Sequence, residues 1–153
     1  MDFLWRETVR FGQVDAAAIV YYPRYFEMLN DCVECWFAEA LDYPFATMVS
    51  RDRCGVPLVD VRVRFARASR LGDQLEFRLR LARLGRSSFE AEVGCACGGE
   101  ERLLARLSHV HVELEPLRSR TIPPALRTRM SAYLADGHES VARSISSGNT
   151  VDI

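Results

Sequence analysis

The sequence contains no lysine. Its 153 residues include 20 basic side chains, and every one of them is arginine. A covalent mechanism that forms a Schiff base with a lysine amine is therefore excluded, and each of these cations is a planar guanidinium that stays charged. Basic and acidic residues almost balance, at a formal net charge of -1. Because nucleic-acid binding depends on excess basic charge, we expect no nucleic-acid partner.

Long apolar runs are also absent. The first ten residues, MDFLWRETVR, carry charges where a signal peptide needs an apolar stretch, and no window of about 18 residues is both apolar and uncharged. We therefore expect a cytoplasmic protein with no membrane partner. The five cysteines are an odd number, which does not suit a disulfide framework, so reduced thiols are the simplest interpretation.

The first part of the chain predicts a strand followed by a long helix. Residues 3–11 alternate loosely between apolar and polar side chains, as in a strand. Pro23 suits the first turn of a helix, because the N–H that proline lacks has no partner there. Apolar residues then recur at helical spacing, at Phe26, Leu29, Val33, Trp36, Phe37 and Ala40.

The second part predicts a sheet. Apolar and charged residues alternate in four segments, at 59–65, 75–81, 89–95 and 103–115. A short helix beginning at Pro123 and Pro124 follows them. One strand, a long helix and four strands predict an α+β domain over residues 1–137 with an antiparallel sheet. The tail, 138–153, is rich in Ser and Gly, and we expect it to be flexible.

The segment VRFGQVDAAAIVYYPRYFEMLND resembles the signature of the 4-hydroxybenzoyl-CoA thioesterase family of hotdog-fold proteins. Weaker similarities follow in ARASRLGDQLEF, GRSSFEAEV and HVHVEL, so that the resemblance extends over residues 5–125. It implies a hotdog fold, in which a five-stranded antiparallel sheet wraps around one long central helix. It also implies hydrolysis of an acyl-CoA thioester without cofactor or metal, by a homo-oligomer, dimer or tetramer, whose active site lies between subunits.

The resemblance implies that Asp15 is the catalytic carboxylate, as nucleophile or as base for water, and that the backbone N–H of Tyr22 holds the thioester carbonyl oxygen. Attack on a thioester places negative charge on this oxygen, and free N–H groups at a helix N-terminus stabilise such charge. Since Pro23 has no N–H, the groups just before it are left for this task.

An alternative for Asp15 is a turn-forming or helix-capping role, which is the commoner use of a loop aspartate. The loop also departs from the family pattern. Gln13 stands where the family usually has a second acid, and Ala16 and Ala18 replace the usual Pro and Gly. These departures leave Asp15 in place but bear on the loop conformation and on the acyl specificity.

Some hotdog thioesterases use a carboxylate on the central helix instead. Glu27, Asp31 and Glu34 are the candidates here. All three fall on the polar stripe of the helix, where a solvated face or a subunit contact is the simpler interpretation. We therefore expect the catalytic carboxylate to be Asp15.

Four residues are candidates for the acyl site: Tyr21, Phe26, Asn30 and Val56. Aromatic residues near the helix start suit an acyl pocket, although Tyr21 and Phe26 could equally belong to the core. Val56 stands where aromatic-acyl members of the family present a small polar residue. Because valine cannot hydrogen-bond a ring hydroxyl, it favours a less polar aromatic or a medium-chain acyl group over 4-hydroxybenzoyl.

Arginines are the candidates for the CoA site. By resemblance Arg86, Arg118 and Arg120 occupy positions that meet the phosphates of CoA, and Ser88, in the same LGRSSF segment as Arg86, is assigned with them to substrate binding. Guanidinium forks suit phosphate, whereas exposed arginines otherwise only confer solubility. We expect the strongest contribution from Arg86.

Cysteine and histidine spacing raises the question of a zinc site. Cys32 and Cys35 have a C-x-x-C gap, but they fall on the apolar side of the predicted helix, so small buried thiols explain them better. We expect His109 and His111 to face the sheet surface or a subunit contact, and we assign no metal site.

Three other functions remain open. A thioesterase acting on acyl groups tethered to a carrier protein would meet an acidic partner with its arginines. A hotdog hydratase or dehydratase would need a histidine near the helix start, and this segment has none. A non-catalytic acyl-CoA binding protein would not need Asp15.

Overall fold

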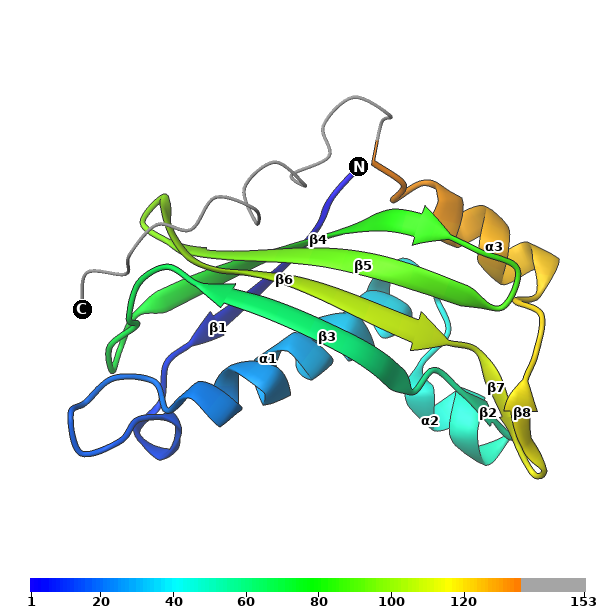
Figure 1. Cartoon of the computed structure of the whole chain (residues 1–153), viewed down its shortest axis with the longest axis horizontal. Helices are drawn as coiled ribbons and strands as arrows, with labels where there is room; N and C mark the ends of the chain where they lie inside the picture. The colour runs from blue at the N-terminus through cyan, green and yellow to red at the C-terminus, as the bar shows by residue number, and fades with distance from the viewer. Residues whose placement is uncertain (136–153) are drawn as a thin grey trace.

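The structure, a computed structural model, describes residues 1–135 and confirms the hotdog fold. A five-stranded antiparallel sheet in the order β1-β4-β5-β6-β3 curves over the long helix α1 (Figure 1). The main elements are β1 (Phe3–Thr8), α1 (Tyr22–Cys35), β3 (Leu58–Phe65), β4 (Gln74–Leu84), β5 (Ser88–Cys97), β6 (Glu100–Val110) and α3 (Pro124–Ser131). The tail at 138–153 lies outside the described residues.

Helix α1 is buried along one face, as its apolar stripe predicts. The buried side chains are Tyr25, Met28, Leu29, Cys32 and Val33. Successive residues turn by about 100° around a helix, so this face is centred between Leu29 and Cys32. Phe26 lies at its margin and remains 37% exposed, which corrects its expected place in the buried stripe.

The core continues beyond α1 in a π-helical turn, Trp36–Ala40. Leu41 N–H donates to the Trp36 carbonyl oxygen at 3.1 Å. Trp36 and Phe37 are fully buried in this wider turn. Both rings pack on Phe89 of β5, each with 5.9 Å between ring centroids, and so join the helix to the middle of the sheet.

Two predicted strands are shorter than expected. The first strand ends at Thr8, and Phe11 lies in a 3-10 turn, Phe11–Gln13, with 82% of its surface exposed. The alternation over 103–115 predicts one strand, but this segment breaks at His111, whose N–H donates to the Ser87 carbonyl oxygen at 2.7 Å. After this break the chain leaves the main sheet.

A second, small sheet follows the break. It contains β2 (Cys54–Gly55), β7 (Val112–Leu114) and β8 (Leu117–Ser119) and lies beside the short helix α2 (Phe45–Ser50), beyond the C-terminal end of α1 (Figure 1). The alternation of apolar residues indicates neither α2 nor this sheet. Over residues 1–135, the helices are all too short or too polar to span a bilayer.

Strand β3 forms one edge of the main sheet and differs from the half-buried strand that its alternation predicts. It pairs with β6 on one side, and in the described residues no strand pairs with its other side. Four of its apolar side chains are exposed: Val59 by 62%, Leu58 by 46%, and Val61 and Phe65 each by 38%. An exposed apolar edge of this kind is a surface on which another chain can pair.

Candidate active site

A hairpin over residues 14–20 presents Asp15 to solvent. Asp15 N–H donates to the Ile19 carbonyl oxygen at 3.0 Å, and Oδ1 of Asp15 accepts the N–H of Ala17 at 2.8 Å. One carboxylate oxygen therefore closes a local turn, as the alternative interpretation of Asp15 requires. The side chain remains exposed, and its second oxygen has no protein partner within residues 1–135.

The hairpin keeps its shape despite an unfavourable residue. Ala18 has φ of 58°, in the left-handed region that favours glycine. An L-residue in this region is destabilised by about 1–2 kcal/mol. The N–H of Leu71 holds the turn from outside by donating to the Ala18 carbonyl oxygen at 3.3 Å. The alanine that replaces the usual glycine thus introduces strain without unmaking the turn.

A free backbone donor lies at the start of α1. Tyr21 N–H donates to the Gln13 carbonyl oxygen at 3.0 Å, and Arg24 N–H donates to the Tyr21 carbonyl oxygen at 2.9 Å. Pro23 has no N–H. The N–H of Tyr22 has no acceptor among the described residues, so it can donate a hydrogen bond to an oxyanion.

Gln13 supports this arrangement. Its side-chain Oε1 accepts the N–H of Arg10 at 2.7 Å, which fixes the 3-10 turn before the hairpin, while its carbonyl oxygen holds Tyr21. Gln13, which replaces the second acid of the family, therefore holds the loop against the start of α1 through these two hydrogen bonds.

Aromatic side chains surround this corner and lie on the surface. Tyr21 is 50% exposed and Tyr22 is 61% exposed, and their rings meet edge to face with 5.5 Å between centroids. Together with the partly exposed Phe26, they do not belong to the core, which removes the alternative considered for Tyr21 and Phe26. They form an apolar surface beside the hairpin that carries Asp15.

A cavity of about 270 Å³ opens near the other end of α1. We call it the acyl cavity; its lining residues are Asn30, Phe45, Met48, Val49, Gly55, Val56, Pro57, Leu58 and His109. The structure thus brings together Asn30 and Val56, which the sequence assigns to the acyl site. The walls are otherwise mostly apolar, as in ligand pockets generally.

The acyl cavity and Asp15 do not meet within one chain. The hairpin precedes the first turn of α1, whereas α2 and β2 lie at the opposite end of the molecule (Figure 1). Asn30, the cavity residue on α1, follows Tyr22 by eight residues, which corresponds to about 12 Å along a helix axis. The cavity and the hairpin of Asp15 are therefore separate features of one chain.

His109 is buried, which corrects the expectation that it faces the sheet surface or a subunit contact. It is 5% exposed, its ring stacks on Phe89 with 4.9 Å between centroids, and Nδ1 lies 2.8 Å from the Val56 carbonyl oxygen. Burial lowers the pKa of His109. The sequence holds the signal for this position, because Leu103, Ala105 and Leu107 alternate into the core and the same period places residue 109 inside.

His111 is also buried, again contrary to expectation, and burial lowers its pKa. Its carbonyl oxygen accepts the N–H of Arg120 at 2.8 Å, and its Nδ1 lies 3.1 Å from the Arg120 carbonyl oxygen. Its own N–H donates to Ser87, beside Arg86. His111 therefore joins the two segments that carry the predicted CoA-binding arginines.

The structure separates these arginines into two kinds. The segments of Arg86 and Arg120 lie side by side, since Ile122 N–H also donates to the Arg86 carbonyl oxygen at 2.9 Å. Both guanidinium groups lack a described ion-pair partner in residues 1–135. Arg118 is engaged differently, because its Nε donates to Glu113 at 2.7 Å. Ser88 begins β5, two residues beyond Arg86.

The helix carboxylates form an exposed acidic stripe. Glu27 pairs with Arg24 at 2.8 Å. Partial burial, followed by the nearby charges of Glu34, Glu7 and Glu27, raises the pKa of Asp31. Among the described contacts none joins these carboxylates to the hairpin of Asp15, so the stripe is a separate surface of α1.

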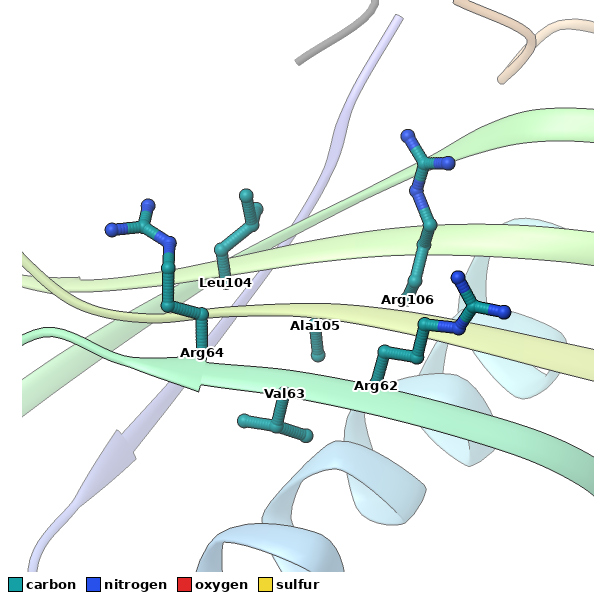
Figure 2. Close-up of a pocket in the computed structure, with 6 residues that line it drawn as sticks. All are labelled: Arg62, Val63, Arg64, Leu104, Ala105 and Arg106. Atoms are coloured by element: carbon teal, nitrogen blue, oxygen red, sulfur yellow. The ribbon is translucent and has the colours of Figure 1, made fainter. Parts of the chain in front are cut away.

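Two other features carry less chemistry. A hollow of about 70 Å³ lies on the outer face of the sheet, lined by Arg62, Val63, Arg64, Leu104, Ala105 and Arg106 (Figure 2). All three arginines form ion pairs: Arg62 with Asp60 at 3.5 Å, Arg64 with Glu101 at 2.7 Å and Arg106 with Glu92 at 3.4 Å.

Cys32 is buried in the core. In the described part of the chain, no group of His, Cys, Asp and Glu residues could hold a metal ion.

Most of the chain matches the model of a known protein family. The model described as the thioesterase-like superfamily matches residues 9–130. A relative from Synechococcus elongatus, 1,4-dihydroxy-2-naphthoyl-CoA hydrolase, is 27% identical over 128 residues, covering 82% of this chain and 93% of the relative. Another of the same name, from Trichodesmium erythraeum, is 28% identical over 76% of this chain and 84% of the relative.

Solved structures agree with the fold. A gentisyl-coenzyme A thioesterase superposes with a TM-score of 0.77 at 23% identity, over 84% of this chain and 99% of that one. A 1,4-dihydroxy-2-naphthoyl-CoA thioesterase from Synechocystis superposes with a TM-score of 0.78 at 19% identity, over 86% and 96% of the two chains. At these identities the likeness concerns the fold.

Proposed function

The chain belongs to the thioesterase-like superfamily and is a thioester hydrolase, and from this premise we propose that it hydrolyses aromatic acyl-CoA thioesters with Asp15 as its catalytic carboxylate. The observation that carries the proposal is the corner at the start of α1, where the hairpin with the exposed carboxylate of Asp15 leads directly into Tyr22, whose N–H has no acceptor within residues 1–135. Such a corner supplies both a nucleophile or base and an oxyanion donor.

The reaction follows from these two groups. The Tyr22 N–H binds the thioester carbonyl oxygen and stabilises the charge that develops there. Asp15 then either attacks the carbonyl carbon, forming an anhydride that water hydrolyses, or takes a proton from the attacking water. In both routes the carbon–sulfur bond breaks, the thiolate of CoA takes a proton, and water supplies the oxygen of the carboxylate product.

The aromatic substrate class is supported by the relatives and by the acyl cavity. Several curated relatives are hydrolases of 1,4-dihydroxy-2-naphthoyl-CoA. The cavity of about 270 Å³ has an aromatic side chain, Phe45, and mostly apolar walls. Within residues 1–135 the guanidinium groups of Arg86 and Arg120 form no ion pair, so they are available for the phosphates of CoA.

A second copy of the chain completes this site. Asp15 and the acyl cavity lie at opposite ends of α1, so we propose that Asp15 of one copy serves the cavity of the other. The exposed apolar edge of β3 and the aromatic surface around Tyr21 are the areas that such a partner would cover. A symmetric dimer repeats both contacts and forms two sites.

A panel of substrates tests the proposal. Release of CoA thiol would be measured with benzoyl-CoA, 4-hydroxybenzoyl-CoA, 1,4-dihydroxy-2-naphthoyl-CoA and hexanoyl-CoA, and with a carrier protein bearing the preferred acyl group. We expect the highest kcat/KM with an aromatic acyl-CoA and slower release from the carrier protein. A preference for hexanoyl-CoA would contradict the aromatic class, and faster release from the carrier protein would move the function to carrier-bound substrates.

A further inference from the structure

We infer that His109 determines acyl specificity by presenting an unprotonated Nε2 as hydrogen-bond acceptor to a hydroxyl group of the acyl ring in the acyl cavity. The inference rests on the proposed hydrolysis of aromatic acyl-CoA and narrows it to hydroxylated rings. His109 is the buried histidine in the wall of this cavity.

The tautomer follows from the partner of Nδ1. A backbone carbonyl can only accept a hydrogen bond, and the Val56 carbonyl oxygen lies 2.8 Å from Nδ1 of His109. Nδ1 must therefore carry the proton. A neutral imidazole has one N–H, so its Nε2 is left as an acceptor with a free lone pair.

The surroundings keep this imidazole neutral. The side chain of His109 is 5% exposed, and burial lowers its pKa. One face of the ring stacks on Phe89, at 11° between the planes. Within residues 1–135, the hydrogen bond to Val56 is the contact that raises the pKa of His109, and no carboxylate is paired with the ring.

Nε2 lacks a protein partner. It is buried, and no donor in the described part of the chain reaches it. A buried polar atom in this state is destabilising, so native structures normally satisfy it with a protein group, water or a ligand. His109 lines the cavity, and the inferred donor is a hydroxyl of the acyl group that fills it.

This arrangement also explains how a valine can stand at residue 56. The side chain of Val56 offers no hydrogen bond to a ring hydroxyl, but its carbonyl oxygen orients His109, whose acceptor performs that task. The stacked Phe89 fixes the plane of the ring from the side. A rigidly held acceptor discriminates between substrates, because an analogue without the hydroxyl leaves it unpaired.

A matched pair of substrates tests the inference. We would measure kcat/KM for 1,4-dihydroxy-2-naphthoyl-CoA and for 2-naphthoyl-CoA, which lacks both hydroxyls. His109→Phe keeps the ring and the stack on Phe89 but removes the acceptor. We expect it to lower the ratio of the two kcat/KM values about tenfold, the effect of one hydrogen bond. His111→Phe, a buried histidine that faces Arg120, is the control and should keep the wild-type ratio.

The outcomes separate the two levels of the proposal. If wild type releases no CoA from either substrate, the proposed function fails. If it releases CoA and His109→Phe keeps the wild-type ratio, the role of His109 is overturned while the function stands. Should the Phe variant not fold, the ¹⁵N shift of Nε2 in wild type decides. It should move when 1,4-dihydroxy-2-naphthoate binds and stay unchanged with 2-naphthoate; equal responses to both acids would refute the inference.

Discussion

The hydroxyl of Tyr25 donates a hydrogen bond to the hydroxyl oxygen of Ser69 over 2.6 Å, and both residues are buried. Burial raises the pKa of Tyr25, which keeps its proton in place. The carbonyl oxygen of Ser69 also accepts the N–H of Val20 at 2.9 Å. Ser69 therefore joins the first turns of α1 to the end of the hairpin that carries Asp15.

Ser69→Ala should destabilise this corner. It leaves the buried hydroxyl of Tyr25 without its acceptor, so we expect the free energy of unfolding to fall by about 1–3 kcal/mol. Urea unfolding would measure the change. Ser108→Ala is the matched control, since Ser108 is a half-buried serine of β6 with no side-chain hydrogen bond in residues 1–135. Equal stability of the two variants would contradict the role of Ser69.

Asp15→Asn is the decisive test of the catalytic carboxylate. Asparagine can still accept the N–H of Ala17 through its side-chain oxygen, so the hairpin should survive. The charge and the basicity are lost, and we expect single-turnover CoA release to slow by roughly 10²–10⁴-fold. Asp15→Ala should be at least as slow, with acyl-CoA binding retained in both variants.

The helix carboxylates provide the controls for that experiment. Glu27→Gln and Asp31→Asn remove charge from the acidic stripe of α1, which contacts Arg24 but not the hairpin. We expect near wild-type CoA release from both. Normal release by Asp15→Asn together with loss in Glu27→Gln would move catalysis onto the helix.

Arg86→Ala should weaken CoA binding more than catalysis. A phosphate contact far from the carbonyl is made in the ground state and in the transition state alike, so KM should rise while kcat changes little. Loss of one charge-assisted contact corresponds to about 1.5–3 kcal/mol. Arg118→Ala should have a smaller effect, because that guanidinium is held by Glu113. An unchanged KM in Arg86→Ala would assign Arg86 to the solvated surface.

The two buried histidines should make stability depend on pH. Burial lowers the pKa of His109 and of His111 in the folded state, whereas in the unfolded chain both titrate near pH 6.5. Below about pH 6.5 the unfolded chain binds protons that the folded chain does not, so the free energy of unfolding falls as the pH falls.

Each histidine changes the free energy of unfolding by at most about 1.4 kcal/mol per pH unit. Urea unfolding between pH 7.5 and pH 5 would measure it, and His109→Phe should have a shallower slope than wild type. The paired carboxylates of Asp52, Glu76 and Glu113 have lowered pKa values, so they change the free energy of unfolding in more acidic solutions than the histidines do. A slope unaffected by the substitution would show that His109 titrates alike in both states.

Val59→Arg should disrupt the assembly. Val59 is 62% exposed on the free edge of β3, and a charge there opposes pairing with another chain. Light scattering should show wild type as an oligomer and the variant shifted to monomer, with loss of CoA release. Leu4→Arg, on the opposite edge strand β1, is the control and should remain assembled. A monomeric wild type with full activity would contradict the shared site.

The sequence predicts the fold well where one pattern dominates. Pro23 and the apolar spacing of α1 predict a helix with Pro23 in its first turn, and the structure begins the helix at Tyr22. The same spacing cannot show how far the buried face extends, since this depends on the curvature of the sheet. Phe26 is therefore exposed where its neighbours Tyr25 and Leu29 are buried.

The candidate site was predictable only in part, for physical reasons. Asp15 and Tyr22 are close in sequence, so a local signature places them together. The acyl cavity instead combines α1, α2 and the strand ends, and its short helix, Phe45–Ser50, has too few residues for a helical period to be recognised. His109 could have been placed by its period-two alternation with Leu107, although not its contact with Val56.

The separation of Asp15 from the acyl cavity along α1 has a genetic consequence. If each site takes its carboxylate from one copy and its cavity from the other, an Asp15→Asn chain and a Val56→Trp chain, each inactive alone, can form a mixed dimer. That dimer has one intact site and one site with both defects. Random reassembly of equal amounts makes about half of the dimers mixed and restores about one quarter of the sites. Two inactive alleles of this protein would thus complement each other in one cell.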